Sequence, residues 1–178
     1  MGIKQNTKDP PPEGNKFALL IGVEAFSDPG IPSLRGVTKD INKLGKLLNN
    51  RQRSEFKVES LRNPSFVQSR KAISKISQQA QVNDVVFFYY SGHGVLDQQQ
   101  SLYLIVRRLG TSFLDATCLE SEFILSQFRK SACQNFIIII DCCHSGKYIG
   151  ILGIVEIFVF LCLAPQKRLV IIPRRDDR

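Results

Sequence analysis

Short apolar runs alternate with amphipathic segments along most of the chain. The apolar run KFALLIGV is closed by Gly22, and VVFFYY and FIIII are followed by the glycine-containing segments SGHG and DCCHSG, a pattern typical of buried strands. FKVESLRN alternates apolar and polar residues and SLYLIV is a shorter apolar run. The pattern therefore predicts strands over residues 16–23, 56–63, 85–90, 101–106 and 136–140.

Helical spacing occupies the segments between these runs. Residues 37–50 carry an apolar face of Val37, Ile41, Leu44, Leu47 and Leu48. Residues 63–80 begin with Asn63 and Pro64, residue types that often open a helix, and residues 119–132 also have a helical pattern. Strands alternating with helices predict an α/β fold with a mostly parallel sheet, covered by helices on both faces.

The composition predicts one soluble domain in a reducing compartment. A chain of 178 residues can bury one hydrophobic core. Residues 1–15 are polar and rich in proline, so we expect a flexible arm without the apolar stretch of a signal peptide. Five cysteines, two of them adjacent, do not suit a disulfide framework, and we expect a cytoplasmic protein. The net charge of +8 is scattered rather than gathered beside exposed aromatic residues, so no nucleic-acid partner is predicted.

The chain has two histidines, and each follows a strongly apolar strand beside a glycine. His93 lies in SGHG, and His144 follows Cys142 and Cys143 in DCCHSG. In parallel sheets ligands bind beyond the carboxyl ends of the strands, where both segments are expected. If the two strands are neighbours, a histidine and a thiol meet there, which is the minimum for nucleophilic catalysis by cysteine.

Three other interpretations compete with catalysis. A histidine at a strand end can be a buried structural residue. The group Cys142, Cys143 and His144 could bind a metal, but adjacent residues cannot easily share one ion and no CxxC spacing is present. The cysteines could also pack in the core, and for Cys142 this interpretation is favoured.

Four segments in this order, KFALLIGV, LRGVTKDINKLGKLL, FFYYSGHG and IIIIDCCHSG, resemble the metacaspase and bacterial caspase-homologue branch of the caspase-like cysteine peptidases. The resemblance covers residues 16–147 and implies a caspase-like three-layer sandwich. It implies that His93 is the general acid/base and that Cys143, directly before HSG, is the nucleophile. It also implies that the N–H of Gly94 stabilises the oxyanion, together with the N–H of Cys143.

The same resemblance implies specificity for basic residues. Asp141, two residues before the nucleophile, and Asp40 match acids of the substrate pocket, and Ser91 matches the serine beside them. Two carboxylates select Arg or Lys through charge-assisted hydrogen bonds. For Asp40 the alternative is a solvated acid on a helix.

Residues 148–178 depart from the family, because they match no recognisable small-subunit sequence. Residues 148–164 are apolar apart from Glu156, and a membrane anchor, a strand or packed helix, and a non-native tail from a truncated or frameshifted gene remain alternatives. The function predicted is a cysteine endopeptidase acting on proteins or peptides with basic residues. The rival is a catalytically incomplete caspase-like module for protein interaction. No cofactor is expected; calcium is known in the family, but no acidic loop identifies a site. The sequence leaves the oligomeric state open.

Overall fold

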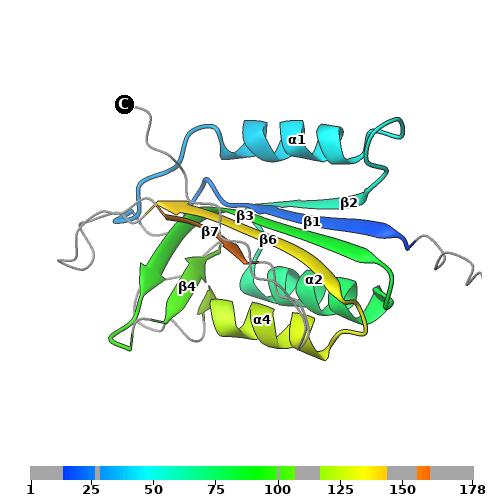
Figure 1. Cartoon of the computed structure of the whole chain (residues 1–178). Coiled ribbons are helices and arrows are strands. Elements are labelled where there is room, and N and C mark those ends of the chain that lie inside the picture. Colours follow the sequence, from blue (N-terminus) through cyan, green and yellow to red (C-terminus); the bar gives the residue numbers. More distant parts are fainter. Residues whose placement is uncertain (1–13, 27–28, 100, 107–116, 144–155, 161–178) are drawn as a thin grey trace, which may run out of the picture.

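The computed structural model describes residues 14–26, 29–99, 101–106, 117–143 and 156–160. Within them one mixed sheet lies between helices (Figure 1). The strands are β1 (Lys16–Gly22), β2 (Lys57–Arg62), β3 (Val85–Leu96), β4 (Leu102–Ile105), β5 (Cys118–Glu120), β6 (Asn135–Cys143) and β7 (Glu156–Phe160). The helices are α1 (Val37–Leu48), α2 (Phe66–Gln79) and α4 (Ser121–Lys130).

The middle of the sheet is parallel, as predicted. Strand β1 pairs in parallel with β2 on one side and β3 on the other, and β3 pairs in parallel with β6. Strand β7 runs antiparallel beside β6. At its far end β3 leaves this set and pairs antiparallel with β4, which in turn pairs with β5. The carboxyl ends of the four parallel strands therefore lie at one edge.

Alternation along the strands divides the core into two faces. On β3, Phe87 and Tyr89 belong to a cluster with Ile41 of α1, whereas Phe88 and Tyr90 belong to the cluster under α2 and α4. In Figure 1, α1 lies above the sheet and the other two helices lie below it. This is the three-layer arrangement with helices on both faces that the sequence predicts.

Two details of the helices differ from expectation. Helix α2 begins after Ser65, whose hydroxyl accepts from the N–H of Gln68 while the Gln68 side chain accepts from the N–H of Ser65. This reciprocal cap satisfies two N–H groups that a helix start leaves without partners. Asn63, predicted to open the helix, instead has a φ of 45° and ends β2. Leu47 is 61% exposed, because it lies roughly 120° around α1 from the buried Ile41.

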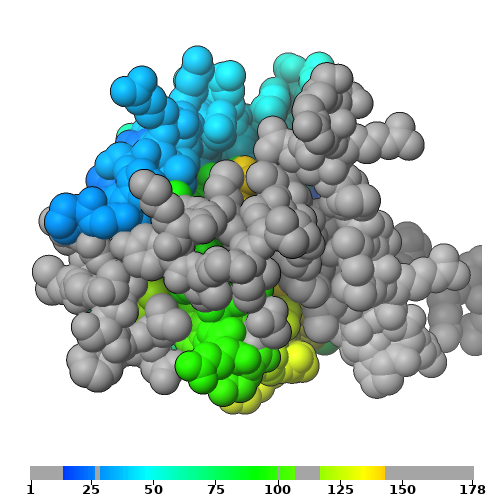
Figure 2. Space-filling model, turned by 90° about the vertical axis from the view of Figure 1, so that its left-hand side faces the viewer, coloured from blue at the N-terminus to red at the C-terminus, as the bar shows by residue number. Residues whose placement is uncertain are grey.

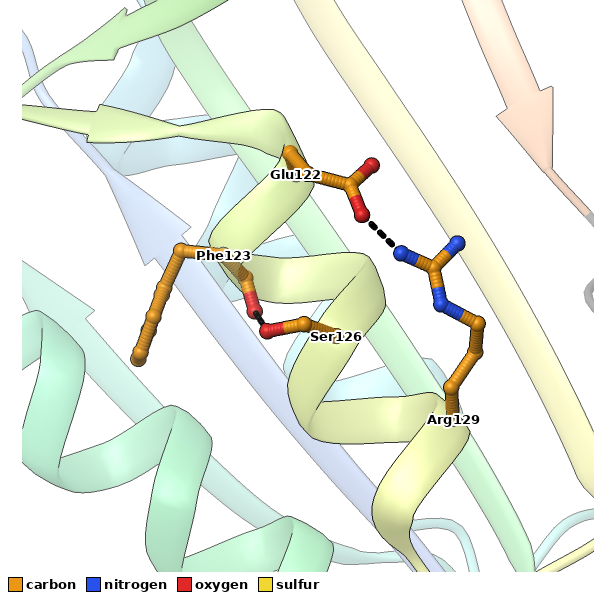
Figure 3. Close-up of polar contacts among 4 residues, drawn as sticks. All are labelled: Glu122, Phe123, Ser126 and Arg129. Carbon is orange, nitrogen blue, oxygen red and sulfur yellow. Dashed lines mark hydrogen bonds and ion pairs between the residues drawn. The ribbon is translucent and has the colours of Figure 1, made fainter.

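Helix α4 is held on its outer and inner sides by different contacts. Along its exposed side Arg129 forms an ion pair with Glu122, and the hydroxyl of Ser126 donates to the carbonyl of Phe123 at 2.8 Å (Figure 3). The guanidinium of Arg70, on α2, lies 3.5 Å from the centroid of the Phe123 ring. Because surface ion pairs contribute little, α4 is attached to the rest of the fold mainly by the buried Ile124 and Phe128, with this cation–π contact in addition.

The two motif-bearing strands are longer than predicted. SGHG was expected beyond the end of its strand, but β3 continues through it to Leu96. The reason is a change of partner: β3 pairs with β6 as far as His93 and then with β4 from Gly94 onward. Strand β6 likewise runs through Asp141 to Cys143, while His144 lies outside the described residues.

Part of the apolar segment after residue 147 is a strand. Residues 156–160 form β7, with Glu156 opposite Cys142 and Phe160 opposite Ile138. Among the helices that the structure describes, none is long and apolar enough to cross a membrane. Of the arm predicted over residues 1–15, residues 1–13 lie outside the described ranges, as does the remainder of residues 144–178. Asn15, at the end of that arm, donates from its N–H to Asp84 and accepts from the N–H of Val85.

The cap of α2 gives a test of the fold. Replacing Ser65 by alanine removes the side-chain acceptor for the N–H of Gln68. We expect Ser65→Ala to lower the free energy of unfolding by about 1 kcal/mol in urea denaturation. Gln78→Ala, an exposed change in the same helix, is the control and should stay within about 0.5 kcal/mol of the wild type. Equal effects of the two variants would contradict the cap.

Candidate active site

The predicted acid/base and nucleophile lie side by side in the sheet. Strands β3 and β6 are neighbours, and their pairing places His93 opposite Cys143 and Ser91 opposite Asp141. The prediction that the two strands are adjacent is therefore confirmed. Figure 2 looks onto the edge where the parallel strands end, with residues of the segment after β1 (blue) beside α1 (cyan) and the β3–β4 turn (green) below.

Cys142 lies in the core and not at this edge. It is 1% exposed and belongs to the cluster that packs under α2 and α4. A Cβ atom on Gly94 would lie 2.8 Å from the sulfur of Cys142. Glycine is therefore needed at position 94 for packing, which supplies a structural reason for this residue in addition to the predicted oxyanion role.

The hydroxyl of Tyr90 organises the backbone around the histidine. It lies 2.8 Å from the carbonyl oxygen of His93 and 2.7 Å from that of Ile105 on β4, and its single proton is shared between these two acceptors. A Cβ atom on Gly92 would lie 2.4 Å from this hydroxyl oxygen, so only glycine fits there. Burial, and next the nearby thiol of Cys142, raise the pKa of Tyr90 well above its usual value. Tyr90 thus stays a neutral donor and connects the His93 backbone to the β4 hairpin.

The side chain of His93 contacts the segment between β1 and α1. Its side chain is 4% exposed, its ring centroid lies 4.9 Å from that of Phe26, and Nε2 lies 2.8 Å from the carbonyl oxygen of Pro32. A carbonyl oxygen can only accept, so Nε2 carries the proton. In the neutral ring, Nδ1 is then the nitrogen that can take a proton from a thiol.

The same segment is anchored to the sheet and to α1. The Asn63 side-chain oxygen accepts from the N–H groups of Glu24 and Ala25 at 2.9 and 3.0 Å. The carboxylate of Glu24 accepts from the N–H of Thr38 at 3.1 Å and so caps α1, whose own N-cap residue is the glycine Gly36. Hydrogen bonds from the side chain and backbone of Thr38 lower the pKa of Glu24. These bonds fix where α1 begins, and therefore where Asp40 lies.

Two of the three residues predicted for the substrate pocket, Asp141 and Ser91, form hydrogen bonds with Tyr89. Its hydroxyl donates to the Asp141 carboxylate at 3.2 Å. Burial, and next the negative charge of Asp141, raise the pKa of Tyr89 to about 12; a hydrogen bond from Ser91 lowers it, and the charge of Asp40 raises it further. Ser91 is buried, Asp141 is half-buried and Asp40 is exposed on the first turn of α1. The acids thus lie on the α1 face of the sheet, near the carboxyl ends of the strands.

The described residues offer no cluster of three or more His, Cys, Asp or Glu side chains that would hold a metal ion. His144, part of the metal-site alternative, lies outside those residues.

Pro32, Tyr89 and Tyr90 are the residues that sequence reasoning missed. The two tyrosines belong to the apolar run VVFFYY. The spacing of apolar residues does not distinguish a tyrosine that only packs from one whose hydroxyl also forms a hydrogen bond important for the site. Pro32 acts through its main-chain oxygen, which carries no sequence signal.

The sequence pattern of the caspase domain matches residues 15–168. This chain belongs to the caspase-domain family. The match extends past residue 147, where the resemblance recognised from the motifs ends, and it includes β7.

Curated relatives of this caspase domain are fungal metacaspases. It is 32% identical over 90 residues to metacaspase-1A of Aspergillus terreus, an alignment covering 46% of this chain and 22% of that protein. It is 34% identical over 90 residues to metacaspase-1 of Eremothecium gossypii, covering 46% and 20%. The alignments thus span about a fifth of the length of these relatives.

A solved structure shares the fold. The crystal structure of a Geobacter sulfurreducens protein superposes with a TM-score of 0.58 at 21% identity, covering 75% of this chain and 52% of that chain. Together with the family match, the shared three-layer arrangement shows that the architecture is caspase-like.

The contact between Gly94 and Cys142 can be tested by stability. In Gly94→Ala the new methyl group would press on the Cys142 sulfur, so we expect a loss of about 1–3 kcal/mol in the free energy of unfolding. Adding Cys142→Ala removes that sulfur and should restore part of the loss, giving a positive coupling in a double-mutant cycle measured by urea denaturation. Strictly additive effects would mean that the two residues do not touch.

Proposed function

We propose that this caspase domain hydrolyses peptide bonds after Arg or Lys, with Cys143 as the nucleophile and His93 as the group that moves protons. The observation that carries the proposal is the pairing of His93 with Cys143 on adjacent parallel strands, two residues beyond the pair formed by Ser91 and Asp141. Membership of the caspase-domain family and similarity to metacaspases support a cysteine peptidase.

The chemistry would follow from the tautomer of His93. Nδ1 takes the thiol proton of Cys143, and the thiolate sulfur attacks the carbonyl carbon of the scissile bond. The resulting tetrahedral oxyanion is stabilised by backbone N–H groups, for which Gly94 and Cys143 are the candidates. Nδ1–H then protonates the departing amine and a thioester remains. Water attacks the thioester while Nδ1 takes its proton, and the acid product leaves as the thiolate is released and reprotonated.

The Pro32 carbonyl would support both protonation states of this cycle. When Nδ1 accepts a proton the ring becomes an imidazolium, and its Nε2–H then donates a stronger, charge-assisted bond to the same oxygen. The ring also keeps its orientation through the cycle, because Phe26 packs against it.

Packing supports the choice of Cys143 over its neighbour. Cys142 lies in the core, closely packed against position 94, where neither a base nor a substrate reaches its sulfur. Adjacent residues of a strand alternate between the two faces of a sheet, so the burial of Cys142 on one face is compatible with a nucleophile at position 143.

The polar groups around Asp141 support the choice of substrate. Asp141 bonds to Tyr89, Ser91 lies opposite Asp141 on the neighbouring strand, and the charge of Asp40 on the first turn of α1 also raises the pKa of Tyr89. An aspartate side chain of a substrate would meet like charge there, whereas Arg or Lys would be attracted.

The nucleophile can be identified by its reaction with iodoacetamide at neutral pH. We expect rapid labelling of the wild type and of Cys142→Ala, and its loss in Cys143→Ala, because an adjacent imidazole favours the thiolate. His93→Ala should slow the labelling on the order of tenfold by removing that imidazole. The readout is intact-protein mass spectrometry over the first minutes.

Labelling that survives in Cys143→Ala and disappears in Cys142→Ala would reverse the assignment. If Cys143 is labelled slowly, and its labelling rate is the same in wild type and His93→Ala, the result would favour the alternative of a non-catalytic interaction module.

Specificity can be tested with fluorogenic peptides that end in Arg, Lys or Asp. We expect cleavage after Arg and Lys and none after Asp. Asp141→Asn keeps the size of the side chain but removes its charge, and should lower kcat/KM for the basic peptides on the order of 100-fold. Asp97→Asn, the same change in the β3–β4 turn, is the matched control and should cleave like the wild type. Cleavage after Asp would refute the acidic pocket.

A further inference from the structure

Tyr89 is placed to control the orientation of the Asp141 carboxylate. Its ring packs with Ala18, Leu20, Ile41 and Phe87 and its side chain is 9% exposed, so the ring has little freedom. It stands in the middle of β3, between β1 and β6, opposite Leu20 on one side and Ile139 on the other. The hydroxyl therefore reaches a fixed point, and at that point it donates to Oδ2 of Asp141.

The donor carries no charge of its own. Burial and the Asp141 charge raise the pKa of Tyr89 to about 12, so the phenol keeps its proton throughout the range in which a peptidase would work. Tyr89 thus holds one carboxylate oxygen without neutralising the aspartate. The attraction of Asp141 for a cation is kept, while rotation of the carboxylate about its own axis is opposed.

A fixed carboxylate matters differently to the two basic side chains. The guanidinium of arginine presents parallel N–H groups in a plane and bonds both oxygens of a carboxylate only when the two planes agree. The ammonium of lysine is a compact charge whose three donors rotate, so it tolerates a turned carboxylate. A carboxylate held in one orientation therefore favours arginine over lysine, whereas its negative charge attracts both side chains alike.

We propose that Tyr89 is a positioning residue that fixes the plane of the Asp141 carboxylate and thereby makes the pocket distinguish arginine from lysine. This inference rests on the proposed function for the location of the pocket, and extends it to a residue that would touch the substrate only through Asp141.

The test is Tyr89→Phe, which deletes the hydroxyl and keeps the ring in its cluster. Binding of N-acetyl-arginine amide and N-acetyl-lysine amide is followed by the backbone amide shifts of Ser91 and Gly92 in nitrogen-15-labelled full-length protein. We expect the dissociation constant of the arginine compound to rise about tenfold, the loss typical of a hydrogen bond to a charged group, and that of the lysine compound to change less than about threefold. With peptide reporters, KM for arginine should rise in the same proportion while kcat changes little.

Tyr90→Phe is the matched contrast, because it is the same deletion one residue further along the strand and on the opposite face. Its hydroxyl contacts the carbonyls of His93 and Ile105 and not Asp141. We expect this variant to lower kcat and to leave the ratio of arginine to lysine affinity as in the wild type. Equal effects of the two variants on that ratio would overturn the role of Tyr89.

The outcomes separate this inference from the proposed function. If Tyr89→Phe weakens arginine binding but no reporter is cleaved, the peptidase proposal fails and the role of Tyr89 stands. If reporters are cleaved and the arginine-to-lysine ratio is unchanged in Tyr89→Phe, the role of Tyr89 is overturned and the peptidase proposal stands. Should the variant fail to fold, the Cζ resonance of Tyr89 in carbon-13-labelled wild type must shift more with the arginine compound than with the lysine compound; equal shifts, or none, overturn the inference.

Discussion

The register between β3 and β6 is the constraint on which the rest of the site depends. At one end the carbonyl of Asp84 accepts from the side chains of Asn135 and Cys133, at 3.0 and 3.1 Å. At the other end Cys142 fits against Gly94 because glycine has no side chain. A slip of one residue would send every side chain of a strand to the opposite face and would separate His93 from Cys143 and Ser91 from Asp141 at once. The proposed acid/base pair and the proposed pocket therefore both depend on one alignment that is secured at both ends.

The two adjacent tyrosines show how one strand serves both faces of a sheet. Tyr89 points its hydroxyl to the α1 side, where the acids lie, and Tyr90 to the α2 side, where it holds the backbone of His93. Both are raised in pKa mainly by burial, so each acts as a neutral donor. The site forms where β3 leaves the parallel strands and turns to β4, because there its backbone is no longer paired to β1.

Much of the fold could be predicted from the sequence, because burial on two faces makes the strands continuous apolar runs and the helices carry one apolar stripe. The candidate residues His93 and Asp141 could be placed close together because each motif directly follows an apolar run, and the two runs are neighbouring parallel strands. Other features depend on tertiary packing. β5 is three residues long and was read as part of a helix, and the extension of β3 depends on its pairing with β4. Gly94 is required by a sulfur 48 positions further along the chain, which no local pattern reveals.

The contact of His93 with Pro32 has a consequence for how such a domain tolerates variation. The acceptor is a main-chain oxygen, so no exchange of the residue at position 32 deletes it, whatever side chain arrives. A single substitution therefore cannot remove the acceptor that keeps the proton on Nε2 of the imidazole. If the acceptor were a side-chain carboxylate, a single substitution could remove it. It is exposed instead to insertions, deletions and altered anchoring, since the bonds of Asn63 to Glu24 and Ala25 help set the path of that segment. Insertions or deletions between β1 and α1 would therefore disturb the hydrogen bond of His93 to position 32 more than substitutions in that segment would.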